Sequence, residues 1–406
     1  MSEAAWLSVP LGIDASRWVT RADCRTVLVV VHTVATGHRL LDVVGLIEED
    51  LRVQVVFTQA PDVFGNGVSD FLRAVNGVCI PWQQAVRERF DLAIVAAYGG
   101  IHELHAPVMV LPHGAGRGKR MVLADGGKNS TSSVYGLDAA RLLRDGRLVP
   151  ASLVLSHMEQ RRVLAQQCPA ALPVAVLAGD PSYDRLRASV TARDAYRAAL
   201  CVCEQQRLVV LASTWGTRSL FTQYVELLPD LVTRLDPQRY RVAVLVHPAT
   251  WFGHGPRQIH AWLAGARAAG LLVIGPTVDW RVAILAADYV IGDHGSTSVY
   301  AASIGVPVLH ADPSIADIAP GSPQEWLSRH APRFNPAEVV EPQLQAAAAK
   351  SRAVAASVAR RLTSCPDQAH RILRDEMYRL LGLSVPGRHR APEPIPVPDQ
   401  MVGRHD

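Results

Sequence analysis

Short runs of β-branched and other apolar residues alternate with amphipathic stretches along the first half of this chain. The runs cover 26–33, 53–57, 91–97 and 108–111, and a further run begins at Ser152. Between them, 38–49 and 67–75 have the periodicity of helices. Strands that are apolar on both faces and separated by helices indicate a parallel sheet covered on both sides, hence an α/β fold.

The same alternation starts again in the second half of the chain. Strands are predicted at 208–213, 242–246, 271–274, 289–291 and 306–309, with helices at 220–235, 256–269, 280–287 and 296–304. The chain has 406 residues, too many for one ordinary core, so we expect two Rossmann-like domains. Their predicted bounds are 22–178 for the N-terminal domain, 179–204 for the linker, 205–332 for the C-terminal domain, 333–384 for C-terminal helices and 385–406 for a disordered Pro/Arg-rich tail.

Composition narrows the classes of protein that this chain could belong to. It is 49% hydrophobic and 19% charged, with a formal net charge of +4 spread along the chain, so we expect no nucleic-acid partner. The six cysteines form no CxxC pair and are expected to be reduced thiols. The first residues do not form a signal peptide, and no apolar run approaches the roughly 20 residues of a membrane helix. We therefore expect a cytoplasmic protein that would contact a membrane only at its surface.

Ligands of open parallel sheets bind beyond the carboxyl ends of the strands, so the loops after the strands are the candidate sites. The strand at 289–291 is followed by a loop of small and polar residues that runs into a helix. The loop residues are Gly292, Asp293, His294, Gly295, Ser296, Thr297 and Ser298. Ser296 or Thr297 could cap the helix, and its first free N–H groups would then form an anion site. The alternative is an ordinary strand–helix turn with a serine cap.

The loop after 108–111 is rich in glycine and basic residues. Around His113 it carries Arg117, Lys119 and Arg120 among three glycines, an electropositive cradle suited to phosphate oxygens. It is not a P-loop, because His113 and Arg120 stand where that motif needs glycine and Ser or Thr. The alternative is a plain surface loop.

Histidines also stand at or just after the ends of two other predicted strands, 26–33 and 242–246. His247 precedes Pro248, and His32 ends the first strand; we rank His247 higher as a functional candidate. The turn 179–184 is predicted to join the domains. No Asp-x-Asp pair occurs, and no G-x-G-x-x-G opens the first helix, so neither a metal-holding glycosyltransferase motif nor a nicotinamide or flavin site is indicated.

Taken in order, these loops resemble those of the CDP-glycerol:glycerophosphate glycerophosphotransferases of teichoic-acid synthesis, within the GT-B superfamily. The matching segments are His113-Gly114, then Gly179, Pro181 and Asp184, then Ser213-Thr214-Trp215, then His247-Pro248, and last Asp293–Ser296 with Gly305–Val308. The chain departs from the family pattern at Gly216, at 114–116 and at His294-Gly295, and the first hundred residues carry none of these motifs. The resemblance implies a GT-B fold, with two Rossmann-like domains facing across a cleft.

The resemblance also implies a mechanism, the transfer of a glycerophosphate or glycosyl group from a nucleotide-diphospho donor to an acceptor hydroxyl. His113 would be the base, and His247 with Asp293, His294, Gly295, Ser296, Thr297 and Ser298 would receive the diphosphate. Ser213, Thr214, Arg117 and Lys119 would complete the donor site. We expect no metal and no cofactor besides the donor.

Two alternatives remain open from the sequence. A nucleotide-sugar 2-epimerase would use the same fold and would need carboxylates as acid and base, with Asp180, Asp184 and Asp293 as candidates. A non-catalytic nucleotide-binding relative is the other. The donor base, the acceptor, which could be a membrane-associated polymer, and the oligomeric state are not set by the sequence.

Overall fold

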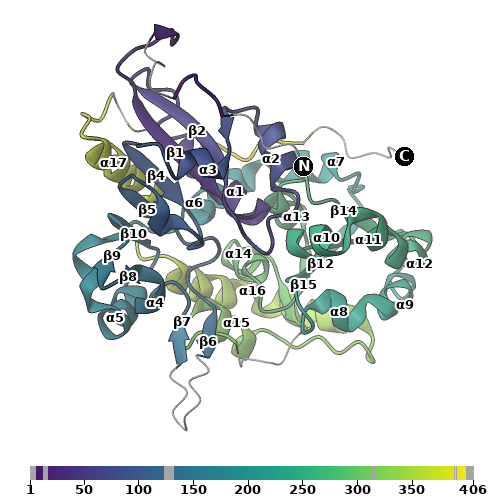
Figure 1. Cartoon of the computed structure of the whole chain (residues 1–406). Coiled ribbons are helices and arrows are strands. Elements are labelled where there is room, and N and C mark those ends of the chain that lie inside the picture. The colour runs from purple at the N-terminus through teal and green to yellow at the C-terminus, as the bar shows by residue number, and fades with distance from the viewer. Residues whose placement is uncertain are drawn as a thin grey trace. The chain divides into compact units, whose positions relative to one another are not determined.

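Two parallel sheets, one in each of two structural units, carry the fold of this computed structural model (Figure 1). The structure describes residues 6–11, 17–122, 132–311, 317–387, 389 and 391–398. The first unit contains Met1–Gly114, Gly136–Pro181 and Ser364–Ala391. The second contains Ala115–Tyr135, Ser182–Thr363 and Pro392–Asp406.

The first unit has a seven-stranded parallel sheet in the order β11-β10-β5-β4-β1-β2-β3. Its strands are β1 (Arg25–Val31), β2 (Val53–Gln59), β3 (Cys79–Ile80), β4 (Leu92–Val95), β5 (Val108–Val110), β10 (Ser152–Leu155) and β11 (Ala175–Leu177). Its helices are α1 (Val34–Val44), α2 (Val68–Val75), α3 (Trp82–Ala85), α4 (Ala139–Leu142), α5 (Met158–Gln167) and α17 (Ala369–Leu381), and β8 (Leu143–Arg144) pairs with β9 (Arg147–Leu148) as a short hairpin.

Helix α1 begins four residues before its predicted start at residue 38. Thr33 is its N-cap, and the side chains of Thr33 and Thr36 form a reciprocal capping box with each other's backbone N–H groups. This cap ends β1 and starts the helix within three residues. Because β1 leads almost directly into the capped helix, no polar loop separates the two in the sequence. The hydrophobic pattern therefore did not mark the start of the helix.

The second unit has a five-stranded parallel sheet in the order β14-β13-β12-β15-β16. Its strands are β12 (Arg207–Ser213), β13 (Tyr240–Val246), β14 (Leu272–Ile274), β15 (Tyr289–Gly292) and β16 (Val308–His310). Its helices are α6 (Pro181–Ser189), α7 (Arg193–Ala199), α8 (Leu220–Tyr224), α9 (Leu228–Thr233), α10 (Pro248–His254), α11 (Pro256–Trp262), α12 (Ala264–Ala268), α13 (Trp280–Ala286), α14 (Ser296–Ser303), α15 (Pro323–His330) and α16 (Val340–Leu362).

Alternate residues of the central strand β12 enter different cores. Leu208 and Val210 belong to a cluster that includes residues of α7, α13, α14 and α16. Val209 and Leu211 belong to a second cluster, with residues of α8 to α12. Side chains of a strand point alternately to the two faces of its sheet, so helices cover both faces of β12. This burial explains why the strands of the second unit read as continuous apolar runs.

The observed division differs from the predicted domains in three places. The predicted linker 179–204 is mostly part of the second unit, because Leu186, Tyr196 and Leu200 are in its core. Segment 115–135 also belongs to the second unit, where β6 (Arg120–Val122) and β7 (Ser132–Val134) form an antiparallel hairpin. Helix α17, predicted with the C-terminal helices, belongs to the first unit, where the Tyr378 hydroxyl donates to Asp50 at 2.8 Å.

The described part of the predicted tail, 385–387, 389 and 391–398, contains no helix or strand. Ile395 within it is 2% exposed and lies in a core cluster of the second unit. Its N–H donates to Ser189 Oγ at 2.9 Å, and its carbonyl accepts from the Tyr196 hydroxyl at 2.6 Å. This part of the tail is therefore anchored. No helix within the described ranges combines the length and apolarity that crossing a membrane requires.

Candidate functional site

Three neighbouring strands of the second sheet end at the predicted donor residues. Strand β12 has β13 on one side and β15 on the other, and all three are parallel. The chain runs from β12 to β13 and β14 on one side, and β15 and β16 lie on the other side. The point where the order reverses, between β12 and β15, is where open α/β sheets bind ligands. Thr214, His247 and Asp293, which directly follow these strands, thus come to one edge.

Asp293 joins the loops on the two sides of this reversal point. It is 1% exposed, and its Oδ2 accepts hydrogen bonds from Thr214 N at 2.8 Å and Leu220 N at 3.0 Å, while Oδ1 accepts from Gly295 N at 3.0 Å. Burial raises the pKa of this carboxyl, although the nearby His294 and the three N–H donors act in the opposite direction. Asp293 therefore holds the two loops together from inside the domain.

Helix α14 begins differently from the prediction. Its N-cap is Gly295, which has no side chain that could cap the first turn, so the predicted cap by Ser296 or Thr297 is wrong. Ser296 Oγ instead accepts a hydrogen bond from Ala115 N at 3.1 Å. Ser298 is buried, and its Oγ has no hydrogen-bond partner among the described residues. The first-turn N–H groups, rather than the Ser298 hydroxyl, are what this helix could present to an anion.

His247 is the N-cap of α10, and its Nδ1 accepts a hydrogen bond from Ala249 N at 3.1 Å. A backbone N–H can only donate, so Nδ1 carries the lone pair, and the proton of the neutral ring is on Nε2. In that form His247 offers an N–H donor, not a base, through Nε2. In this tautomer, Nε2–H can donate a hydrogen bond to a phosphate oxygen.

Ser213 and Thr214 shape the loop after β12. Ser213 Oγ donates to Thr214 O and accepts from Phe221 N, both at 2.9 Å, and the Ser213 residue is buried. Ser213 is therefore a structural residue of this loop. Thr214 is half-buried, and its N–H is engaged by Asp293.

The glycine-rich segment after His113 is built into the second unit. Gln324 Nε2 donates to Ala115 O at 2.7 Å, and Ala319 N donates to Gly118 O at 2.8 Å. Arg117 is buried, whereas Lys119 is exposed and places its Nζ 5.0 Å from the centroid of the Trp215 ring. Lys119 thus reaches the loop that follows β12.

Trp215 and Gln324 were not among the predicted site residues. Trp215 follows Thr214 in the loop after β12 and is 38% exposed. A tryptophan in the loop that follows a central strand is a signal that the sequence did contain. Gln324 contacts Ala115 across more than 200 residues of sequence. No local pattern could have identified Gln324.

His113 lies in the first unit, after β5, and its side chain is exposed. The next residue, Gly114, accepts a hydrogen bond from Arg39 Nη2 at 3.0 Å. The same guanidinium pairs with Asp180 at 3.1 and 3.3 Å, and both side chains of this ion pair are buried. The loop that carries His113 is therefore tied to α1 and to the turn 179–184.

His32, which ends β1, is a structural residue. It is fully buried, and its Nε2 lies 2.7 Å from Gly99 O. Burial lowers the pKa of its imidazole, so the ring is neutral at neutral pH. Within the described ranges, no group of three or more His, Cys, Asp or Glu side chains could hold a metal ion.

Each unit is Rossmann-like, because it has a parallel sheet whose strand order reverses beside its first strand. Solved structures with two such units share this fold, and the predicted GT-B fold class is confirmed. The wall teichoic acid polymerase TagF has this fold, with a TM-score of 0.59 and 12% identity over 88% of this chain and 89% of that one. A TagF variant soaked with CDPG gives a TM-score of 0.60 at 11% identity, over 88% of both chains.

A second kind of enzyme shares the fold. UDP-GlcNAc 2-epimerase from Neisseria meningitidis, bound to UDP-GlcNAc, has a TM-score of 0.51 and 10% identity over 88% of this chain and all of that one. No protein-family model and no curated protein sequence matches the chain. The resemblance noted in the sequence is thus confirmed as a likeness of fold, and the roles of the individual site residues stay predictions.

Proposed function

We propose that this protein is a transferase that binds a nucleoside-diphosphate-activated donor at the carboxyl edge of the second sheet. It moves the glycosyl or glycerophosphate group of that donor to an acceptor hydroxyl. The observation that carries the proposal is that the loops after β13, β12 and β15 lie at one edge of the sheet, and that Asp293 joins the loops after β12 and β15 at the reversal point. The ligands named for the neighbours, CDPG and UDP-GlcNAc, are of the donor class proposed here.

The donor diphosphate would be held by hydrogen-bond donors and one cation. The first turn of α14 supplies N–H groups and the positive end of the helix, and His247 supplies Nε2–H. Lys119, above Trp215, supplies a positive charge. These groups would stabilise the negative charge that develops on the leaving phosphate.

In the transfer step, the acceptor oxygen attacks either the anomeric carbon of a sugar or the phosphorus of a glycerophosphate group. The bond from that atom to the nucleotide phosphate oxygen breaks, and the nucleotide leaves with the electron pair. The acceptor hydroxyl gives its proton to His113, whose exposed imidazole would act as the general base.

The burial of the candidate carboxylates supports transfer over epimerisation. An epimerase needs carboxylates that reach the substrate, and all three candidates are buried. Asp180 is paired with Arg39, and Asp293 accepts three backbone hydrogen bonds. None of them is placed as an acid or base at the surface of a site. Formation of an epimer from the donor alone, without an acceptor, would reverse this preference.

The first test is a thermal-shift screen against CDP, UDP, GDP and dTDP and their sugar or glycerol conjugates. We expect one nucleotide to raise the Tm selectively, since a ligand that binds only the folded state stabilises it. His247→Ala should remove most of the shift, measured against the Tm of the ligand-free variant, because the variant also loses a helix cap. His254→Ala, at the other end of the same helix, should keep the shift. No shift with any nucleotide would refute the donor site.

The second test separates transfer from binding. With the selected donor and a panel of hydroxyl acceptors, His113→Ala should abolish release of the free nucleotide while the thermal shift stays unchanged. Full turnover in this variant would remove His113 from the mechanism. Nucleotide binding with no turnover by the unaltered protein on any acceptor would instead identify a non-catalytic nucleotide-binding protein.

A further inference from the structure

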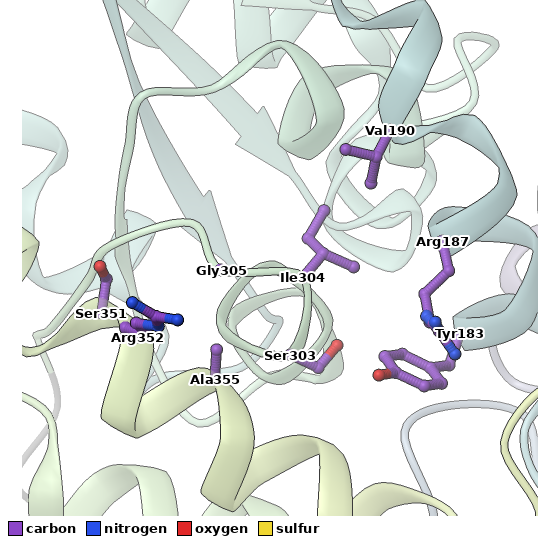
Figure 2. A pocket seen from close by; sticks show the side chains of 9 residues that line it. All are labelled: Tyr183, Arg187, Val190, Ser303, Ile304, Gly305, Ser351, Arg352 and Ala355. Carbon is purple, nitrogen blue, oxygen red and sulfur yellow. The ribbon is translucent and has the colours of Figure 1, made fainter.

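A cavity lies within the second unit, apart from the donor edge. It has a volume of about 560 Å³ and is bounded by α6 and the residue after it, by the end of α14 with the turn that follows, and by α16 (Figure 2). Helix α14 separates it from the donor edge, because Ser296 begins this helix and Ser303 ends it at the cavity. Eight residues of helix at about 1.5 Å each span about 12 Å.

Two arginines give this cavity its charge. Arg187 comes from α6 and Arg352 from α16, and Figure 2 shows their side chains at opposite ends of the lining, with Ile304 between them. None of the residues that line the cavity is acidic. Arg187 lies 5.9 Å from the centroid of the Tyr183 ring, a contact that favours a guanidinium over the ring face. The lining therefore carries one arginine at each end.

Two serines give the lining acceptor atoms between these charges. Ser303 Oγ donates its hydrogen to Tyr300 O at 2.7 Å, and Ser351 Oγ donates to Ala348 O at 2.8 Å. A hydroxyl whose hydrogen is engaged in this way still has lone pairs. These two oxygens could accept hydrogen bonds from the hydroxyl groups of a ligand.

Most of the last carbonyls of α14 are bonded within the turn that follows it. The carbonyls of Tyr300, Ala301 and Ala302 accept hydrogen bonds from the N–H groups of Ile304, Gly305 and Val306 at 3.1–3.3 Å. Gly305 has a φ of +94°, which lets the chain turn back for these contacts. These bonds reduce the negative partial charge that the end of the helix presents to the cavity.

We propose that this cavity binds a hydroxylated metabolite with an anionic group at each end, such as a sugar bisphosphate. Arg187 binds one phosphate and Arg352 the other, while the hydroxyls in between donate to Ser303 and Ser351. The volume is within the range of about 300–1,000 Å³ that is usual for small-molecule sites. The proposal does not depend on the donor site, since none of the residues that line this cavity belongs to that site.

Calorimetric titration of the full chain with fructose 1,6-bisphosphate tests the proposal. We expect Arg187→Gln and Arg352→Gln each to weaken binding by about 10-fold or more, because each removes a charged hydrogen-bonding partner. Glucose 6-phosphate, which has only one phosphate, should also bind the unaltered protein at least about 10-fold more weakly than the bisphosphate does. Arg360→Gln removes the same charge from an exposed position two turns along α16 and should leave binding unchanged.

Three results would overturn the proposal. The first is no binding of the bisphosphate at millimolar concentration. The second is binding that both arginine variants retain. The third is binding that is lost in His247→Ala or on saturation with a nucleotide, which would place the bisphosphate at the donor edge. Co-sedimentation with anionic vesicles that needs both arginines, without binding of the soluble bisphosphate, would assign the two charges to a membrane surface instead.

Discussion

Two aspartates show at the scale of single residues how surroundings set the sign of a pKa shift. Asp50 accepts hydrogen bonds from Arg52 Nη2 at 2.7 Å and from the Tyr378 hydroxyl at 2.8 Å, and the arginine holds its pKa well below the usual range. The buried hydroxyl of Tyr378 has its pKa raised to about 12, by burial and then by this aspartate. The hydrogen-bond partners of Asp293 within the described part of the chain are neutral backbone donors, and burial dominates and raises its pKa.

The two shifts predict opposite dependences of stability on pH. For Asp293, the unfolded carboxyl ionises near its ordinary pKa of about 3.9 while the folded one keeps its proton, so its contribution to the unfolding free energy falls as pH rises above that value. For Asp50, the folded carboxyl ionises first, so its contribution is present above about pH 3.9 and is lost as pH falls through the depressed folded pKa.

Urea unfolding from pH 3 to pH 7 checks this prediction. The unfolding free energy of the unaltered protein minus that of Asp293→Asn should decrease as pH rises, whereas the same difference for Asp50→Asn should increase. Each variant serves as the control for the other, since both replace an aspartate by its neutral isostere. Slopes of the same sign would show that one of the two carboxyls has been assigned the wrong pKa shift.

At the scale of elements, the loop between β15 and α14 depends on a close approach at Gly295. A Cβ there would lie 3.1 Å from Asp293 Oδ1 and 3.3 Å from Thr214 Cβ, although the backbone angles of φ −67° and ψ 160° suit any residue. Asp293 is fully buried, and it also holds the Thr214 N–H, so neither neighbour moves easily.

Gly295→Ala should therefore lower the unfolding free energy by about 1–3 kcal/mol, the usual range for an overpacked site, and reduce the thermal shift produced by the nucleotide. The matched control is Gly253→Ala in α10, where an added Cβ meets nothing within 4 Å. That change should raise the unfolding free energy by about 0.5–1 kcal/mol. Equal effects of the two substitutions on stability and nucleotide binding would show that the close approach is unimportant.

The sequence predicted the strands of both sheets better than the elements around them. Burial on both faces makes the central strands continuously apolar, so β12, predicted at 208–213, is observed at Arg207–Ser213. The predicted helix at 220–235 is instead divided into α8, a 3-10 turn and α9. The candidate residues after β12, β13 and β15 were predictable because parallel strands end at one edge.

Long-range contacts account for what the sequence did not predict. Ser296 or Thr297 was expected to cap α14, but the Ser296 hydroxyl accepts a hydrogen bond from Ala115, about 180 residues earlier in the chain. The hairpin of β6 and β7 joins the second unit because Arg120 N donates to Asp317 O. Neither contact leaves a periodicity or a spacing in the sequence.

At the scale of the whole molecule, neither unit is a single continuous piece of chain. The first unit needs α17 from near the C-terminus, and the second unit includes Pro392–Asp406 after the chain has left it at Thr363. Ile395 is the buried residue in the described part of this segment, 392–398, and it packs in the same core cluster as Tyr196. Anchoring of the segment should therefore contribute to the stability of the second unit.

Ile395→Ala should lower the unfolding free energy by less than about 2 kcal/mol, the low end for a buried Ile-to-Ala change, because the segment can leave its place instead of keeping a cavity. The Ile395 amide, which donates to Ser189 Oγ, should then lose its protection from hydrogen exchange. Val397→Ala in the same segment, at a side chain that is 46% exposed, should change stability by no more than about 0.5 kcal/mol and leave that amide protected. An unprotected Ile395 amide in the unaltered protein would show that the segment is not anchored, and the stability of the second unit would then owe nothing to it.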